Sequence, residues 1–249
     1  MSSNSAKKIS DLRIKSLKCL IESLKINSLL LNQSYEQEIN LFTIVNEALT
    51  HTSANKAVNH ERLEFIGDAV LRLAASEFIG NKFPKLSVGR SSAMRSQLVS
   101  DKWLSMVGND IGIESFIIMG AKAERDSSAL ETIKAESTEA LIGALYEWSN
   151  SLKPIHLWLE SYWNESSKTY MNDPHKYNPK SALQEWSQGS GLKLPFYKST
   201  ELSKTHGDLK RFLCEVYIDS ESIGQGSGKS IKDAEKMAAL NALDKIDKN

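Results

Sequence analysis

Carboxylates at helical spacing are the side chains of this sequence best suited to carry chemistry. Glu61, Glu64 and Asp68 stand at positions i, i+3 and i+7 of the segment HERLEFIGDAVL. At about 100° per residue, the three side chains lie within roughly 60° of one another on one helix face. A solvated acidic surface is an equally good interpretation of this pattern. Two features favour a site. The segment is strongly apolar around them, and a glycine inside the helix, Gly67, indicates close packing by another backbone.

A second acidic pair, Glu136 and Glu139, lies at i and i+3 in the segment AESTEALIGAL and is also followed by a glycine, Gly143. Two helices that bring these acidic faces together would assemble a site made entirely of oxygen ligands. Hard divalent cations such as Mg²⁺ prefer such ligands, and the sequence has no Cys and His cluster at zinc spacing. A site of this kind suits phosphoryl chemistry, because the ion activates water and stabilises charge on phosphate oxygens.

The elements that must position these carboxylates are helices. Between residues 9 and 165, apolar residues recur every three or four positions, for example over 63–78 and 135–148, without convincing strand alternation. We therefore expect an all-α domain over residues 1–167. Residues 168–178 are polar and poor in aliphatic side chains, which predicts a linker.

Residues 179–249 predict a small α+β domain of order α-β-β-β-α. The expected elements are a helix over 179–188, strands over 196–202, 212–219 and 222–226, and a helix over 230–246. Ser230 and Asp233 fit the start of the last helix. Its expected inner face consists mostly of small residues that would let it lie close on a sheet: Ile231, Ala234, Ala238, Ala242 and Ile246.

Composition bounds the class of protein. The chain has 249 residues, of which 41% are apolar and 25% charged, and this argues against a largely disordered chain. It has no apolar run of about 18 residues, so we expect no membrane span, and its polar start lacks a secretory signal. The two cysteines, Cys19 and Cys214, are expected to be reduced core residues, which predicts a cytoplasmic protein.

Four segments resemble, in order, the recurring blocks of the ribonuclease III family. Residues 61–71, ERLEFIGDAVL, are similar to its signature helix, and residues 138–144, TEALIGA, to its other acidic helix. Residues 48–53, ALTHTS, and 94–99, MRSQLV, resemble two further blocks. One helical domain followed by one α-β-β-β-α domain is similar to the bacterial type of the family.

The resemblance implies roles for the carboxylates. Glu64, Asp68, Glu136 and Glu139 match positions that bind the catalytic divalent ions, expected to be Mg²⁺ with Mn²⁺ as a substitute. Asp68 and Glu139 match the catalytic pair, and Glu61 matches an auxiliary acidic position nearer the edge of the site.

Two positions depart from the family pattern. Glu136 stands where the family usually has Asp, so metal binding is expected to survive with altered geometry or rate. Val88 stands where an acidic residue is frequent, which leaves no carboxylate for an auxiliary role there. The family works as a homodimer whose signature helices face each other. Phe65 and Ile66 are therefore candidates for a dimer interface and, equally, for core packing.

The C-terminal order resembles the double-stranded RNA-binding domain, which contacts A-form shape, 2′-hydroxyls and phosphates. Lys229, Lys232 and Lys236 cluster at the positive start of the last helix, where RNA phosphates are attracted. Gln184 matches a minor-groove contact on the first helix, and His206 matches a loop that enters the next minor groove. Each of these is also an ordinary surface residue type, and the domain order is what favours RNA binding.

A phosphate-binding loop is excluded for the run GQGSGKS at residues 224–230. It has three residues between its outer glycines where a P-loop needs four, and it lacks the βαβ context.

These features predict an endoribonuclease that hydrolyses double-stranded RNA with divalent metal ions, leaving 5′-phosphate and 3′-hydroxyl ends, in rRNA and mRNA maturation. The alternative is a non-cleaving protein that holds structured RNA and retains the fold, and the four carboxylates favour cleavage. The net charge of zero is the sum of two opposite parts. Residues 1–175 have 19 Lys and Arg against 21 Asp and Glu, whereas residues 176–249 have 12 Lys and Arg against 10 Asp and Glu. RNA affinity is therefore expected to depend on Mg²⁺ and to fall as salt rises.

Overall fold

The structure is a computed structural model that describes residues 9–31, 33–172, 179–205 and 207–246. The chain divides into two compact units, Met1–Ser167 and Lys168–Asn249. Helix α8 (Lys153–Asn172) continues past this division, so the first five residues of the predicted linker are helical. No helix among the described residues is long and apolar enough to cross a bilayer.

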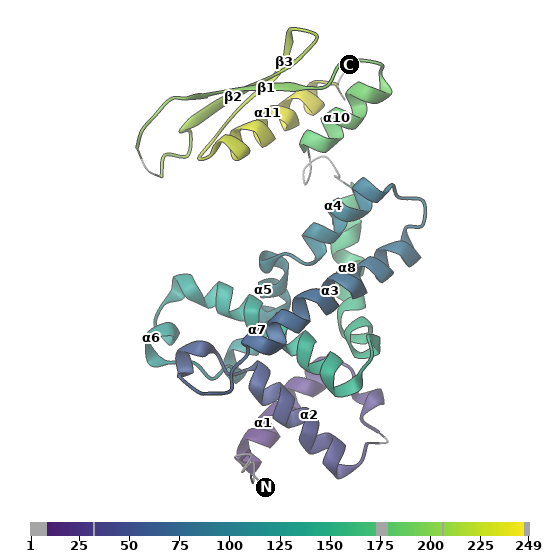
Figure 1. The fold of residues 1–249 in the computed structure, drawn as a ribbon, viewed down its shortest axis with the longest axis vertical. Coiled ribbons are helices and arrows are strands. Elements are labelled where there is room, and N and C mark those ends of the chain that lie inside the picture. The colour runs from purple at the N-terminus through teal and green to yellow at the C-terminus, as the bar shows by residue number, and fades with distance from the viewer. Residues whose placement is uncertain (1–8, 32, 173–178, 206, 247–249) are drawn as a thin grey trace. The chain divides into compact units, whose positions relative to one another are not determined.

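The first unit is built from helices (Figure 1). Its α-helices before α8 are α1 (Asp11–Ser23), α2 (Tyr35–Ala48), α3 (Glu61–Lys82), α4 (Val88–Leu98), α5 (Asp101–Asp110), α6 (Ala121–Glu124) and α7 (Ser127–Ser149). Three short 3₁₀ turns join them: η1 (Asn27–Leu29), η2 (Thr52–Ala54) and η3 (Ile113–Phe116). The unit confirms the predicted all-α class, since its described residues contain one isolated β-bridge, between Thr50 and Ile118, and no longer strand.

Helices α3 and α7 pack against each other so closely that their backbones touch. A Cβ atom added to Gly67 of α3 would lie 1.9 Å from the backbone oxygen of Glu139 on α7. A Cβ atom added to Gly143 of α7 would lie 2.1 Å from the backbone oxygen of Leu63 on α3. The close approach expected from the mid-helix glycine is therefore confirmed, and it brings the two acidic helices together.

A buried cluster of aromatic side chains supports the far end of α3. Trp163 of α8 is fully buried, stacks on Trp103 with ring centroids 6.2 Å apart, and lies 5.5 Å from the ring of Phe78. Trp158 is also buried. Cys19, in contrast, is exposed on α1, and its predicted place in the core was wrong, whereas Cys214 is buried.

The second unit has the predicted order α-β-β-β-α. Its elements are α10 (Pro179–Gly189), β1 (Phe196–Glu201), β2 (Phe212–Ile218), β3 (Glu221–Gly228) and α11 (Ile231–Ile246). The strands form one antiparallel sheet in the order β1-β2-β3, and both helices cover the same face of it (Figure 1). The core between them combines apolar residues of the sheet and helices with the small side chains of α11: Leu183, Cys214, Val216, Ala234, Ala238, Ala239, Ala242 and Leu243.

Alternate glycines of β3 face α11. Cβ atoms added to Gly224, Gly226 or Gly228 would lie 2.3–2.6 Å from backbone atoms of α11. The glycines of the rejected P-loop therefore serve helix-on-sheet packing, and β3 is longer than the predicted strand over 222–226. Ile231 was wrongly placed on the inner face of α11, because 49% of its surface is exposed.

Replacing Gly67 by alanine should destabilise the helical unit by about 1–3 kcal/mol, the usual cost of overpacking, because the added methyl group would meet the α7 backbone. Gly80 on the same helix is a matched control, since a Cβ atom there has nothing within 4 Å. Gly80→Ala should instead stabilise by about 0.5–1 kcal/mol through helix propensity. Urea unfolding followed by tryptophan fluorescence measures both, and equal stabilities of the two variants would contradict the packing described.

Candidate active site

Four predicted metal-binding carboxylates converge on one open hollow of the helical unit. Glu64 and Asp68 come from α3, and Glu136 and Glu139 come from α7. The hollow has a volume of about 620 Å³ and is completed by Glu61 and other residues of α3 and the loops before it: His51, Thr52, His60 and Phe65. Glu61, the predicted auxiliary residue, is exposed and lines the hollow.

Glu139 is the carboxylate of this hollow whose pKa is raised most strongly. Burial, and then the charges of Asp68, Glu64 and Asp101, raise its pKa to about 7. A proton is therefore held on Glu139 near neutral pH in the absence of a cation. A carboxyl group in this condition favours a bound cation, because a positive charge in the hollow would replace the proton.

Asp68 has a positive partner one helical turn further along α3. The Nε atom of Arg72 donates a hydrogen bond to Oδ1 of Asp68 at 2.6 Å. Both side chains are about half exposed, so this pair contributes little to stability by itself. Arg72 instead supplies a compensating charge next to the acidic cluster. The sequence reasoning assigned no role to Arg72, although its i, i+4 spacing from Asp68 could have indicated the pair.

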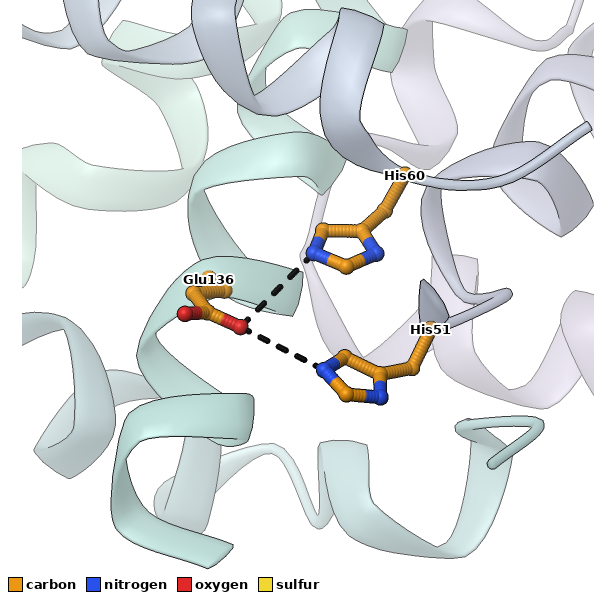
Figure 2. Close-up of side chains that lie close together, drawn as sticks. All are labelled: His51, His60 and Glu136. Carbon is orange, nitrogen blue, oxygen red and sulfur yellow. Dashed lines mark ion pairs between the residues drawn. The ribbon is translucent and has the colours of Figure 1, made fainter. Parts of the chain in front are cut away.

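Glu136 lies between two histidines (Figure 2). Its Oε2 atom is 3.5 Å from Nε2 of His51 and 3.7 Å from Nε2 of His60. The two imidazole rings stack with centroids 5.0 Å apart, and Nε2 of His60 is also 3.1 Å from Oε2 of Glu64. The site therefore contains imidazole nitrogen as well as carboxylate oxygen.

Backbone pairing fixes the loop that carries His51. The N–H of His51 donates to the carbonyl of Ile118 at 2.9 Å, and the N–H of Ile118 donates to the carbonyl of Leu49 at 2.7 Å. His60, 2% exposed, directly precedes α3 and donates its own N–H to the carbonyl of Thr50 at 2.9 Å. It gives α3 no side-chain cap, because its ring points into the site.

The charges and the burial of this cluster shift the pKa values of its members in opposite directions. Burial lowers the pKa of His60, but the Glu136 carboxylate and the charge of Glu64 outweigh it, so the pKa of His60 is raised. The same contact with His60 lowers the pKa of Glu136 despite its burial. Burial and then the charge of Glu136 raise the pKa of Glu64, while burial and the charge of His60 lower the pKa of His51.

Sequence reasoning placed His51 near the site without a defined contact, and it assigned no role to His60. The missing information was tertiary for His51, because the bridge between Thr50 and Ile118 joins residues far apart in the chain. For His60 a local signal existed, since its i, i+4 spacing from Glu64 fits a pair on one helix face.

The donor atoms of this hollow fit a divalent cation. The carboxylates supply hard oxygen ligands from two rigid helices, and His51, His60 and Glu136 offer three ligand atoms within 4.8 Å of one another. The raised pKa of Glu139 shows that like charge accumulates there without a counterion. Val88, at the start of α4, is 87% exposed and is not one of the described residues that line the hollow.

The predicted dimer candidates differ in burial. Phe65 of α3 is 82% exposed at the rim of the hollow, so core packing is wrong for this residue. Ile66 is half-buried, which fits either interpretation. Leu73 lies two helical turns beyond Phe65 and is 54% exposed.

The predicted RNA-contacting residues of the second unit that are described all lie on its surface. Lys229, Lys232 and Lys236 are exposed around the start of α11, and Gln184 is exposed on α10. The start of α11 is capped as predicted, because Ser230 Oγ accepts the Asp233 N–H at 3.1 Å and donates to its carboxylate at 2.8 Å. His206 lies outside the described residues.

Comparison with known proteins agrees with both units. Residues 42–150 match the Ribonuclease-III-like family, and residues 179–246 match the double-stranded RNA binding motif. Ribonuclease 3 from Prochlorococcus marinus is 60% identical over 203 residues, which are 82% of each chain. Ribonuclease 3 2 from a Nostoc species is 37% identical over 79% of this chain and 81% of that protein. The solved nuclease domain of ribonuclease III from Campylobacter jejuni is 30% identical, covers 59% of this chain and 97% of its own, and has a TM-score of 0.47. The chain thus belongs to the ribonuclease III family.

Proposed function

We propose that this chain, a double-strand-specific endoribonuclease, cleaves RNA at the hollow between α3 and α7 with Mg²⁺ held by Glu64, Asp68, Glu136 and Glu139. The observation that carries this proposal is the convergence of the four carboxylates on one open hollow. When bound, Mg²⁺ supplies an activated water and neutralises charge on the scissile phosphate, and Mn²⁺ can substitute for it. Hydrolysis leaves a 5′-phosphate and a 3′-hydroxyl.

The protein's own residues prepare the hollow for this reaction. Asp68 and Glu139 act as the catalytic pair, and Glu139 must lose the proton that burial and its neighbours hold on it. Arg72 and His60 compensate the remaining negative charge before the cation binds. The contact between the α3 and α7 backbones holds the carboxylates in place, so little of their conformational freedom is lost during the reaction.

The second unit holds the substrate. Lys229, Lys232 and Lys236 at the start of α11 would contact phosphates, and Gln184 on α10 and His206 would enter successive minor grooves. Such contacts select duplex shape and not base sequence. We further propose precursors of rRNA and mRNA as the substrates. The cytoplasm is proposed as the location, which the two free cysteines support.

We also propose that the enzyme is a homodimer joined through α3. We define an apolar strip on α3 by two exposed side chains, Phe65, which lines the acidic hollow, and Leu73. Two such strips packed together would remove apolar surface from water and give one acidic hollow for each RNA strand.

Asp68→Asn and Glu139→Gln should each slow Mg²⁺-dependent cleavage of a perfect RNA duplex by more than about a hundredfold. Even the loss of a hydrogen-bond partner of a metal ligand costs roughly 10–100-fold. Gel-based cleavage assays measure the rate, and filter binding in Ca²⁺ should show that duplex affinity persists.

Glu160→Gln, an exposed carboxylate on α8, is the matched control and should cleave normally. Full activity of either site variant would disprove the proposed roles. A wild-type chain that binds the duplex but leaves it uncut with every metal tried would favour the non-cleaving alternative.

Metal-free protein should lose part of its stability as the pH rises from about 4.5 to about 7. The folded chain holds a proton on Glu139 up to its pKa of about 7, whereas the ordinary value for a glutamate is 4.5. The folded state therefore binds more protons than the unfolded state in this window, and the free energy of unfolding falls as pH rises. Glu139→Gln should show a smaller decline, measured by urea unfolding in EDTA. Superimposable pH profiles of the two proteins would contradict the shift.

Lys232→Ala and Lys236→Ala should each weaken duplex RNA binding and reduce the slope of log affinity against log salt by about 1. Fluorescence anisotropy in Ca²⁺ at several salt concentrations measures both quantities. Lys198→Ala is the control, because this exposed side chain lies on β1 between Tyr197 and Ser199, which face the helices. An equal loss of affinity in all three variants would argue against a contact specific to α11.

Phe65→Glu should convert the dimer to monomers in sedimentation velocity experiments, because it places a charge in an apolar contact. Val88→Glu adds the same charge at another exposed apolar position, on α4, and should leave the dimer intact. A wild-type chain that sediments as a monomer at all concentrations, or dimers that survive in Phe65→Glu, would refute the proposed interface.

A further inference from the structure

We propose that His51, His60 and Glu136 form a binding site for a divalent transition-metal ion that accepts imidazole nitrogen, such as Zn²⁺ or Co²⁺. The inference rests on the proposed function only in that Glu136 also belongs to the oxygen set assigned to Mg²⁺. It adds a second class of cation with its own ligands at the edge of the same hollow.

The separations of the Glu136 oxygen from the two histidine nitrogens are close to those of a first coordination sphere. Oε2 of Glu136 is 3.5 Å from Nε2 of His51 and 3.7 Å from Nε2 of His60. Two ligands of a tetrahedral ion, each about 2.0–2.1 Å from the metal, are about 3.4 Å apart. Both histidine Nε2 atoms face the same carboxylate oxygen, and the three ligand atoms lie within 4.8 Å of one another (Figure 2).

The hydrogen bonding of His60 directs its free nitrogen toward the site. Its Nδ1 atom lies 3.3 Å from the carbonyl oxygen of Thr50, which can only accept, so Nδ1 carries the proton. In the neutral ring Nε2 therefore presents a lone pair to Glu136 and to Glu64. These lone pairs face carboxylate oxygens, and either a proton on Nε2 or a metal ion in its place relieves their repulsion. Metal-ligating histidines typically donate their other ring N–H to a backbone carbonyl in this way.

His51 has an acceptor at the same ring position. Its Nδ1 atom is 2.7 Å from Ser53 Oγ and also receives the Ser53 N–H at 3.2 Å. Ser53 Oγ is held in turn by the backbone N–H of Gly120 at 3.0 Å. In the metal-bound form Nδ1 would carry the proton and donate it to Ser53 Oγ, the Ser53 N–H would give up its bond to Nδ1, and Nε2 would be free for the ion.

The chemistry of these donors separates the two cations. Mg²⁺ prefers oxygen ligands and retains water, whereas imidazole suits Zn²⁺ and similar ions. An ion on the two histidines would take Glu136 out of the oxygen set. The two classes of cation therefore compete for this one carboxylate.

Co²⁺ titration of the full-length, tag-free chain tests the site without RNA or catalysis, because bound Co²⁺ has visible absorption bands that depend on its ligands. The chain is first stripped with EDTA and dialysed. We expect one equivalent of Co²⁺ to give an intense visible absorption band, which indicates an ion of low coordination number. Added Zn²⁺ should displace the Co²⁺ and remove the band. Absence of this band in the wild-type chain would overturn the proposal.

Variants assign the ligands. His51→Asn, His60→Asn and Glu136→Gln should each weaken Co²⁺ binding at least tenfold. His156→Asn is the matched control, because its Nε2 atom forms a similar pair with Glu77 at 3.0 Å but lies on α8. A band that persists unchanged in both site-histidine variants, or that is lost in His156→Asn, would refute the assignment.

A second measurement covers the case in which a buried-histidine variant does not fold. In wild-type protein labelled with ¹⁵N-histidine, one equivalent of Zn²⁺ should shift the signals of two of the five histidine rings. Shifts in no ring, or in one ring only, would exclude the two-histidine site. Cleavage of duplex RNA in Mg²⁺ is assayed separately, so failure of the transition-metal site and failure of the proposed nuclease function give different results.

Discussion

The contact between the backbones of α3 and α7 is the constraint on which the site depends. Helices ordinarily pack with their axes 8–10 Å apart because side chains separate them. At Gly67 and Gly143 no side chain intervenes, and each glycine lies against a backbone carbonyl of the other helix. Carboxylates that start from these two helices consequently share one hollow, although they come from segments about 70 residues apart in sequence.

This close contact also creates the electrostatic problem that the rest of the site compensates. Burial, and then repulsion between the carboxylates brought together, raise the pKa of Glu139. The neighbouring loops contribute His51 and His60, which lie against Glu136. Burial disfavours such charges, and their pairing offsets part of that cost.

Much of this arrangement could be predicted from the sequence, because it follows from the spacing of residues within single helices and strands. Helical spacing placed Glu64 and Asp68 on one face, and the cost of Gly67 within a helix indicated backbone contact. The order of the second unit followed from the change in periodicity. The loop histidines could not be fully placed in this way, since the contacts of His51 depend on backbone pairing with Ile118, a distant segment.

Other differences arose where one residue type serves two purposes. Glycines of β3 are typical of turns, yet here their missing side chains admit α11, so the strand was predicted too short. The residues 168–172 resemble a linker in composition, yet they continue α8, and Tyr170 among them is buried. Ile231 fits the apolar pattern of α11 but lies in its first turn, where the sheet does not cover it.

The ion pair between Arg72 and Asp68 has a further consequence for how the site is loaded. A cation that takes Asp68 as a ligand competes with the guanidinium, either by taking Oδ1 from it or by binding Oδ2 beside it, so loading is in part an exchange of one positive charge for another. Such an exchange weakens the net affinity and keeps the bound ion replaceable. It also leaves a displaced guanidinium beside the hollow at the moment when a phosphodiester arrives, and guanidinium groups bind phosphate well.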